Sequence, residues 1–232
     1  MLDGLALSTL DWWAEAGVDM LVDECPRDWL ARSPAPAVAA PAPPAAAPAV
    51  PDKLPDDLPA FRRWLLADAK VPGPVRARHD AMGDPTSGCM VVVDMPEAGD
   101  RGTAQLLTGD AGALFDRMLA AIGLDRAHLY LAPFSPARPA TGKLDKAACH
   151  LLEELMRHHL SLVAPKRVLL LGDAPVCALL GAPVAQSRGR AHPLKVGAHS
   201  VSAVASFPPR LVQGTDLRRS AWADLQLFQE LA

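Results

Sequence analysis

Four short apolar runs alternate with helical patterns through the C-terminal part of the chain, and this alternation limits the fold most strongly. The runs are residues 90–94 (MVVVD), 129–132 (LYLA), 167–171 (RVLLL) and 201–205 (VSAVA), and helical patterns cover residues 111–122, 145–163, 174–180 and 219–231. Short apolar runs that alternate with amphipathic helices are typical of parallel strands buried on both faces. The sequence therefore predicts a three-layer α/β/α sandwich with a four-stranded parallel sheet.

A segment of almost pure Pro and Ala divides the chain. Residues 33–51 read SPAPAVAAPAPPAAAPAVP, a composition that cannot bury a core and prefers an extended, semi-stiff conformation. Before it, apolar residues recur at helical spacing up to Pro26. We therefore expect an N-terminal helical segment at residues 1–32, a linker at residues 33–52 and an α/β domain at residues 53–232.

Charge and cysteine content exclude several classes of protein. The formal net charge of −3 excludes a uniformly basic nucleic-acid coat but allows a local basic face. No stretch approaches the roughly 18 to 20 apolar residues of a membrane helix, so we expect a soluble, cytoplasmic protein that does not bind membranes.

The four cysteines, Cys25, Cys89, Cys149 and Cys177, form no C-x-x-C pair. We expect reduced, buried structural thiols and neither a metal nor another cofactor.

The loops that follow the four predicted strands are the candidate functional segments, because ligands bind beyond the carboxyl ends of strands in such sheets. These loops read DMPEAGD, PFSPARP, LGDAP and SFPPR in chain order. The first begins with Asp94, and two of the others place Pro close to Arg. The loops predict one site that contains carboxylates and cations.

Segments of this region resemble the uracil-DNA glycosylase superfamily, in particular its bacterial and archaeal branch. The best-matched pieces are GDAGALFDRMLAAIGLDRAHLYLAP (109–133), ACHLLEELMRHHLSLVAPKRVLLLG (148–172), SRG (187–189) and RRSAWADL (218–225). The resemblance extends from about Met90 to the C-terminus. It implies a base-excision DNA repair protein that hydrolyses the N-glycosidic bond of a base flipped out of DNA.

Several positions depart from the motifs of that superfamily. The carboxylate of the first motif is retained as Asp94, which is followed by Met95 and Pro96. By the resemblance, Leu107 replaces the aromatic ring that stacks on the flipped base, and Pro133 replaces the Asn that reads the base edge. Phe207 replaces the His of the final motif. Ala137 replaces a cysteine, and only Cys149 falls on a cysteine position of the iron–sulfur members, so the resemblance implies no cluster.

These departures remove groups that would stabilise the transition state for hydrolysis of the N-glycosidic bond. Cleavage of the N-glycosidic bond forms an oxocarbenium-like sugar and a base anion, so it requires a carboxylate near the sugar and donors near the base. Pro133 and Phe207 offer no such donors, and removing one donor typically costs about 2.7 to 4 kcal/mol of transition-state stabilisation. The resemblance therefore predicts weak hydrolysis or an altered choice of base, with Asp94 as the catalytic carboxylate and Met95, Pro96, Leu107, Pro133 and Phe207 around the base.

A basic excess near the C-terminus indicates DNA contact. Between residues 186 and 219, six Lys and Arg side chains accompany one acidic residue, Asp216. The apolar, Pro-containing loop FPPRLV resembles a wedge that unstacks bases. We expect weak, salt-dependent binding of DNA through Arg138, Arg188, Pro208, Pro209, Arg210, Arg218 and Arg219.

Three classes of function remain open from the sequence. The first is a glycosylase with weak activity or altered base choice, and the second is a DNA-binding module without turnover whose N-terminal helix binds a protein partner. The third is a small-molecule-binding α/β protein, because a fold does not fix a function. In a purely structural interpretation, Asp94 caps a turn, Phe207 belongs to the core and the arginines form a solvated surface.

Overall fold

The computed structural model describes residue 12, residues 53–197 and residues 199–231. The chain divides into two units, residues 1–45 and 46–232, of which the second contains the α/β fold. The predicted N-terminal helix, apart from Trp12, and the whole Pro/Ala linker lie outside the described residues. No helix in the described part of the chain combines the length and hydropathy that a membrane crossing requires.

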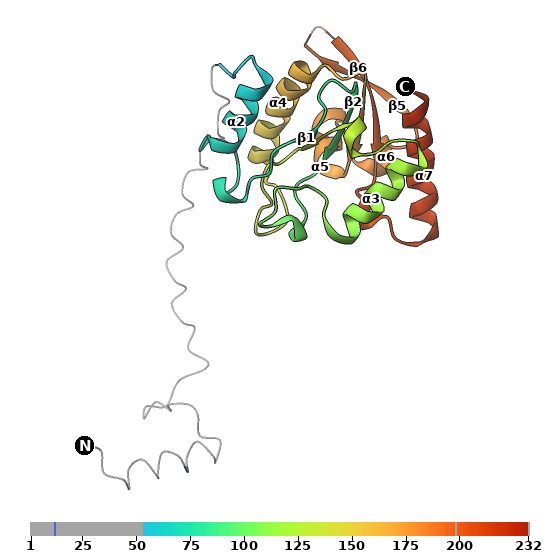
Figure 1. The fold of residues 1–232 in the computed structure, drawn as a ribbon, viewed down its shortest axis with the longest axis horizontal. Coiled ribbons are helices and arrows are strands. Elements are labelled where there is room, and N and C mark those ends of the chain that lie inside the picture. Colours follow the sequence, from blue (N-terminus) through green and yellow to red (C-terminus); the bar gives the residue numbers. More distant parts are fainter. Residues whose placement is uncertain (1–11, 13–52, 198, 232) are drawn as a thin grey trace, which may run out of the picture. The chain divides into compact units, whose positions relative to one another are not determined.

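A six-stranded sheet forms the centre of the domain (Figure 1). Its spatial order is β1-β3-β2-β4-β6-β5, formed by β1 (Met82–Gly83), β2 (Cys89–Val93), β3 (Tyr130–Pro133), β4 (Arg167–Leu171), β5 (Ala191–Val196) and β6 (His199–Ser206). The four inner strands run parallel, and β1 and β5 pair antiparallel with β3 and β6. The prediction of a four-stranded parallel sheet was therefore wrong in the number of strands and in the two antiparallel edges.

Both edge strands lack the continuous apolar pattern that identified the inner strands. β1 has only two residues, and β5 alternates mainly between exposed and buried positions and contains Pro193. Proline within a sheet is largely confined to edge strands, where its missing N–H costs no ladder bond. By contrast, every residue of β2, β3 and β4 is buried.

Helices cover both faces of this sheet. One hydrophobic cluster joins alternate strand residues such as Met90 and Val92 to side chains of α2 (Leu58–Ala67), α4 (Lys146–Val163) and α5 (Asp173–Leu180). The opposite cluster joins Val91 and Val93 to α3 (Gly109–Ala121) and α7 (Gly214–Glu230). Successive strand residues point to opposite faces, so one continuous apolar run contributes to both layers.

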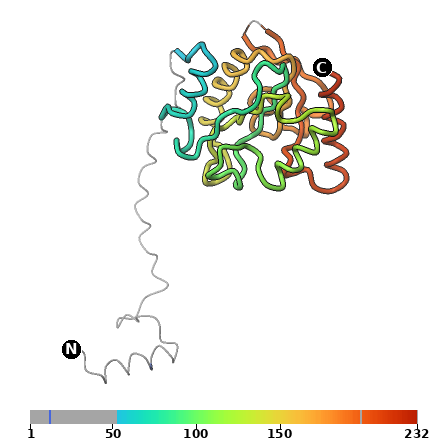
Figure 2. The backbone as a smooth tube through the Cα atoms, in the orientation of Figure 1, coloured from blue at the N-terminus to red at the C-terminus, as the bar shows by residue number. Residues whose placement is uncertain are grey.

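The remaining helices are short or lie outside the sheet faces. They are α6 (Val184–Ser187) and the 3-10 turns η1 (Val75–Ala77), η2 (Ala98–Asp100), η3 (Arg126–His128) and η4 (Pro209–Leu211). The chain path in Figure 2 shows α2 beside α4, and residue contacts between these two helices agree with that placement. The turn η4, which directly follows the carboxyl end of β6, contributes to the candidate site.

Candidate functional site

The carboxyl ends of three neighbouring strands bring the candidate loops together. Val93 at the end of β2 is in register with Leu171 of β4, and Leu171 is in register with Ser206 of β6. The next residues along each strand are Asp94, Gly172 and Phe207. A cleft of about 840 Å³ opens at this edge, and both Asp94 and Phe207 line it. The structure thus places these two side chains at one cleft, which Arg138 and Gly172 do not line, and the roles expected for them stay predictions.

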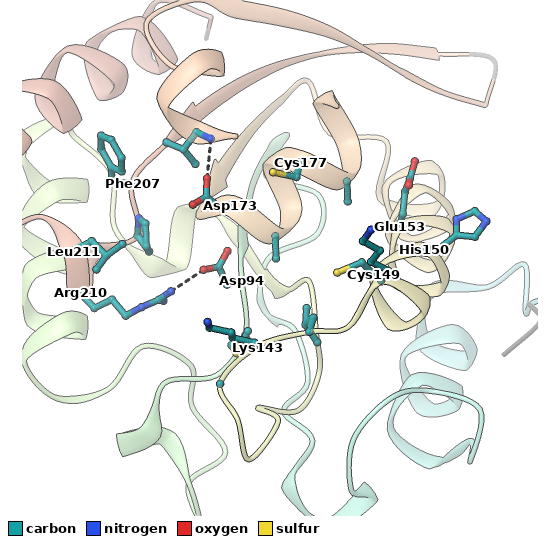
Figure 3. A pocket seen from close by; sticks show the side chains of 18 residues that line it. Asp94, Lys143, Cys149, His150, Glu153, Asp173, Cys177, Phe207, Arg210 and Leu211 are labelled. Atoms are coloured by element: carbon teal, nitrogen blue, oxygen red, sulfur yellow. Dashed lines mark hydrogen bonds and ion pairs between the residues drawn. The ribbon is translucent and has the colours of Figure 1, made fainter. Parts of the chain in front are cut away.

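Asp94 is a buried carboxylate at the floor of the cleft, with 6% of its surface exposed. The guanidinium of Arg210 donates to its Oδ2 at 2.8 Å (Figure 3). Its Oδ1 is also buried and has no hydrogen-bond partner in the described part of the chain. Burial raises the pKa of Asp94 above its ordinary value, although the Arg210 guanidinium acts in the opposite direction. Asp94 is therefore a desolvated carboxylate whose charge depends on one arginine.

Gly172 allows Asp94 to occupy this position. Its backbone has a φ of 109° and a ψ of 165°, a conformation that is essentially restricted to glycine. A Cβ atom built on Gly172 would overlap both oxygens of the Asp94 carboxylate. The glycine after β4 thus creates the space in which the carboxylate packs.

Arg210 belongs to a network of four charged residues, of which Asp94 and Arg210 line the cleft. Besides Asp94, it contacts Glu97 Oε1 at 3.0 Å. The guanidinium of Arg138 lies 3.8 Å from Glu97 Oε2 and donates to the carbonyl of Pro96 at 3.3 Å. Since these residues follow β2, β3 and β6, the network ties three loops together.

Phe207 lies at the junction of the two hydrophobic layers. It is half-buried and packs against both core clusters. The guanidinium of Arg188 stands over its ring at 5.8 Å from the centroid. The ring also lines the cleft, so packing in the core and contact with a ligand are compatible for this residue.

The structure brings only some of the predicted base-pocket residues to this cleft. Met95 lines it, together with Asp94 and Phe207, whereas Pro96, Leu107 and Pro133 do not. Leu107 is buried with a φ of 54°, and its amide donates to the carboxylate of Asp100 at 3.0 Å. Pro133 is the last residue of β3 and is paired with Val93 inside the sheet.

The predicted DNA-contacting residues are dispersed in the same way. Pro208 and Arg210 line the cleft, whereas Pro209 is buried in η4. Arg188 is bound to the fully buried Asp224 at 3.1 Å and to the carbonyl of Ser220, so it supports the packing of α7.

Two further arginines of the predicted face lie on α7. Arg218 and Arg219 are both exposed. Arg218 lines a separate hollow of about 210 Å³ between α3 and α7, and Arg219 lies 3.7 Å from Asp216. The predicted basic face therefore divides into paired charges near the cleft and exposed charges on the helix layer.

Several residues that line the cleft were absent from the sequence prediction. Lys143 and Lys146 lie before and at the start of α4, Asp173 begins α5, and Cys149 and Cys177 come from the same two helices. The order of the elements could have identified these residues. A helix that follows a parallel strand begins at the carboxyl edge of the sheet, so its first turn lies near a site at that edge. Of these residues, only Asp173 lies in one of the four candidate loops, LGDAP, where no role was predicted for it, and the others lie outside those loops.

The described residues include no group of three or more His, Cys, Asp or Glu side chains arranged to hold a metal ion. Cys89 is buried in β2, as expected, and Cys25 lies outside the described residues. Cys149 is partly exposed and Cys177 is exposed, and both line the cleft, so the expectation of buried structural thiols was wrong for these two. Burial raises the pKa of Cys149 above its ordinary value. The expectation that the protein requires no metal or cofactor stays a prediction.

Helices cover both faces of the sheet, and a cleft with the buried carboxylate of Asp94 opens at its carboxyl edge, so the domain is an α/β domain of the doubly wound type. The family model of the uracil DNA glycosylase superfamily matches residues 81–231, which is more than half of the chain. The chain therefore belongs to the uracil DNA glycosylase superfamily. Among curated proteins, no sequence matches this chain at a significant level.

Proposed function

We propose that the protein binds DNA at the carboxyl-edge cleft and hydrolyses the N-glycosidic bond of a flipped base only slowly. Membership in the superfamily supports a glycosylase-like function. Asp94 is the carboxylate that would stabilise the sugar cation, because it lies at the floor of the cleft beside the loops expected to contact DNA. Phe207, Met95 and Leu211 supply an apolar wall for the base.

The ion pair between Asp94 and Arg210 is the observation that most supports slow hydrolysis. A carboxylate stabilises a developing cation most strongly when its own charge is not neutralised by a nearby cation. Here Arg210 occupies Oδ2, while Oδ1 is packed against Gly172 and is not exposed to the cleft. Neither oxygen is free to position water unless Arg210 moves away.

A DNA-binding module without turnover is the second candidate. It is favoured by the same ion pair and by the absence of side-chain donors at Pro133 and Phe207, where the superfamily resemblance places them. From the sequence we also propose an altered choice of base, membership in the bacterial and archaeal branch of the superfamily, and a protein partner for residues 1–32.

Single-turnover assays of base release distinguish the two candidates. The substrates are single- and double-stranded oligonucleotides that carry uracil, hypoxanthine or xanthine, and the variants are Asp94→Asn and Glu97→Gln. We expect slow release by the unmodified protein and none by Asp94→Asn. Glu97→Gln should retain release, because Glu97 contacts Arg210 but does not line the cleft.

Binding of the same oligonucleotides is measured in parallel. Asp94→Asn should bind them as tightly as the unmodified protein or more tightly, because it removes repulsion toward phosphate. Binding without release on every substrate would identify the module without turnover. Release that survives Asp94→Asn would show that another residue is the catalytic one.

A further inference from the structure

The hollow between α3 and α7, called the α3–α7 hollow below, is lined by apolar side chains and two arginines. Met118, Val212 and Leu225 line it and are buried. Trp222 of α7 also lines it, and 41% of its surface is exposed. It is one of the four large apolar side chains that are exposed in the described part of the chain. An aromatic ring that a ligand can reach therefore borders this apolar hollow.

The charged side chains that line the α3–α7 hollow are both cations. Arg117 and Arg218 are exposed, and neither forms an ion pair or a side-chain hydrogen bond with the described residues. The acidic residues nearest to them in the sequence, Asp116 and Asp216, have other arginine partners, at 2.6 and 3.7 Å. Neither of these acids lines the hollow. The charge that the hollow presents to a ligand is therefore positive.

The size of the α3–α7 hollow suits one side chain of a protein partner. Its volume of about 210 Å³ is below the range of about 300 to 1,000 Å³ that is typical of small-molecule sites. Protein interfaces gain most of their affinity from a few large side chains that fill pockets, and Trp and Arg are enriched at such positions. The hollow therefore fits an apolar anchor residue better than a whole small molecule.

The two arginines select the residues that flank this anchor. Arg117 comes from α3 and Arg218 from α7, and Figure 1 shows these two helices next to each other. Arginine binds carboxylates through paired hydrogen bonds, so carboxylates beside the anchor would complement both cations. A nucleic-acid strand fits less well, because grooves for such strands follow the backbone with many cations and this hollow offers two.

We propose that the α3–α7 hollow binds an acidic peptide segment of a partner protein. One large apolar side chain of the partner packs against Trp222 and Met118, and neighbouring carboxylates pair with Arg117 and Arg218. No residue that lines this hollow also lines the cleft at the carboxyl edge, so the site is independent of the proposed function. Arg218 is thereby assigned to a protein contact, and not to the DNA contact expected from the sequence.

The first experiment identifies the chemistry of the partner without assuming it. A phage-displayed library of random dodecapeptides is selected on the immobilised full-length protein, after depletion on the Trp222→Ala variant. Trp222 is exposed, so this substitution should leave the fold intact, which circular dichroism checks. We expect the enriched peptides to carry an aromatic or Leu residue next to several Asp or Glu residues. Enrichment of peptides without acidic residues, or no enrichment after the depletion, would overturn the proposal.

The second experiment measures how the arginines and the indole contribute. The most enriched peptide is labelled with fluorescein, and its anisotropy is measured with Arg117→Ala/Arg218→Ala, with Trp222→Phe and with the control Arg63→Ala/Arg76→Ala. The control removes two exposed arginines from α2 and η1, and α2 packs on the opposite face of the sheet. We expect the first variant to bind about tenfold more weakly, and the other two to bind nearly as well as the unmodified protein. Unchanged binding by the first variant would contradict pairing of the arginines with carboxylates.

Two further measurements test other occupants of the α3–α7 hollow. An excess of single-stranded oligonucleotide should leave the labelled peptide bound, and displacement of the peptide would assign the hollow to nucleic acid. Sedimentation velocity should give the same mass for the full-length protein and for Trp222→Ala. A dimer that Trp222→Ala converts to a monomer would assign the hollow to a second copy of the chain. Either of these two results would overturn the assignment to a partner peptide.

Discussion

At the scale of single residues, the candidate site depends on a glycine as much as on its charged groups. Asp94 can be buried beside β4 because Gly172 has no side chain and adopts a φ of 109°. Arg210 then supplies the positive charge that a buried carboxylate requires, at 2.8 Å. The carboxylate, the arginine and the glycine therefore form one structural unit.

Gly172→Ala should disrupt this unit. The new Cβ would overlap the Asp94 carboxylate, so the carboxylate must move and its contact with Arg210 should weaken. Gly189→Ala is the matched control, because Gly189 has a φ of 77° but no atom within 4 Å of an added Cβ. Backbone strain of this kind costs about 1–3 kcal/mol.

We expect Gly189→Ala to lower the free energy of unfolding by the backbone strain alone. Gly172→Ala should lower it by about 1 kcal/mol more. Urea unfolding measures both differences. Equal destabilisation by the two substitutions would contradict the packing of Asp94 against Gly172.

At the scale of elements, the sequence predicted those parts of the fold whose residues all face apolar surroundings. β4 was predicted with its observed bounds, and the other inner strands and the long helices differ at their ends. β5 was missed because only one of its faces is buried, and Pro193 weakens its strand pattern. The pattern of apolar residues identifies strands that are buried on both faces, so it misses edge strands, which are only partly buried.

The same reasoning explains which site residues could be predicted. Asp94 and Phe207 follow inner strands directly, so the position of the strand fixes the position of the side chain. Arg188 could not be assigned, because its partner Asp224 lies 36 residues away on α7 and is identified only by the packing of that helix. A local excess of charge in the sequence does not show which charges are paired.

The packing of α4 against β3 should make stability depend on pH. His159 of α4 is almost fully buried, and its Nε2 lies 2.9 Å from the Tyr130 hydroxyl. Burial, with a smaller contribution from the Arg62 charge, lowers the pKa of His159 to about 4. Below about pH 6.5 the unfolded chain binds a proton at this residue while the folded protein does not.

The free energy of unfolding should therefore fall as the pH decreases from about 6.5 to about 4, by up to about 3 kcal/mol from His159 alone. Below this range the contribution is constant. His159→Gln keeps a polar partner for Tyr130 but does not titrate, so it should lose this part of the pH dependence. Urea unfolding of both proteins at several pH values tests this expectation, and equal slopes would contradict it.

At the scale of the whole molecule, the described core is formed by the segment after the Pro/Ala-rich stretch. The two hydrophobic clusters and the residues packed against them come from Leu54 to Leu231 in the described part of the chain. The segment between residue 53 and the family-matched span contributes α2, whose Phe61 is fully buried. Its Arg62 binds Asp80 at 2.7 Å and the carbonyl of Ala81. The folding unit thus begins before the region that defines the superfamily.

Two truncations test this boundary. A fragment of residues 53–232 should fold cooperatively and melt within a few degrees of the full chain, because it retains both hydrophobic clusters. A fragment of residues 81–232 keeps the family-matched span but loses Phe61 and the Arg62–Asp80 pair. Loss of a buried Phe side chain alone typically costs about 3–5 kcal/mol, so the shorter fragment should be strongly destabilised or unfolded. Thermal unfolding followed by circular dichroism compares them, and equal melting temperatures would show that α2 is dispensable for the domain.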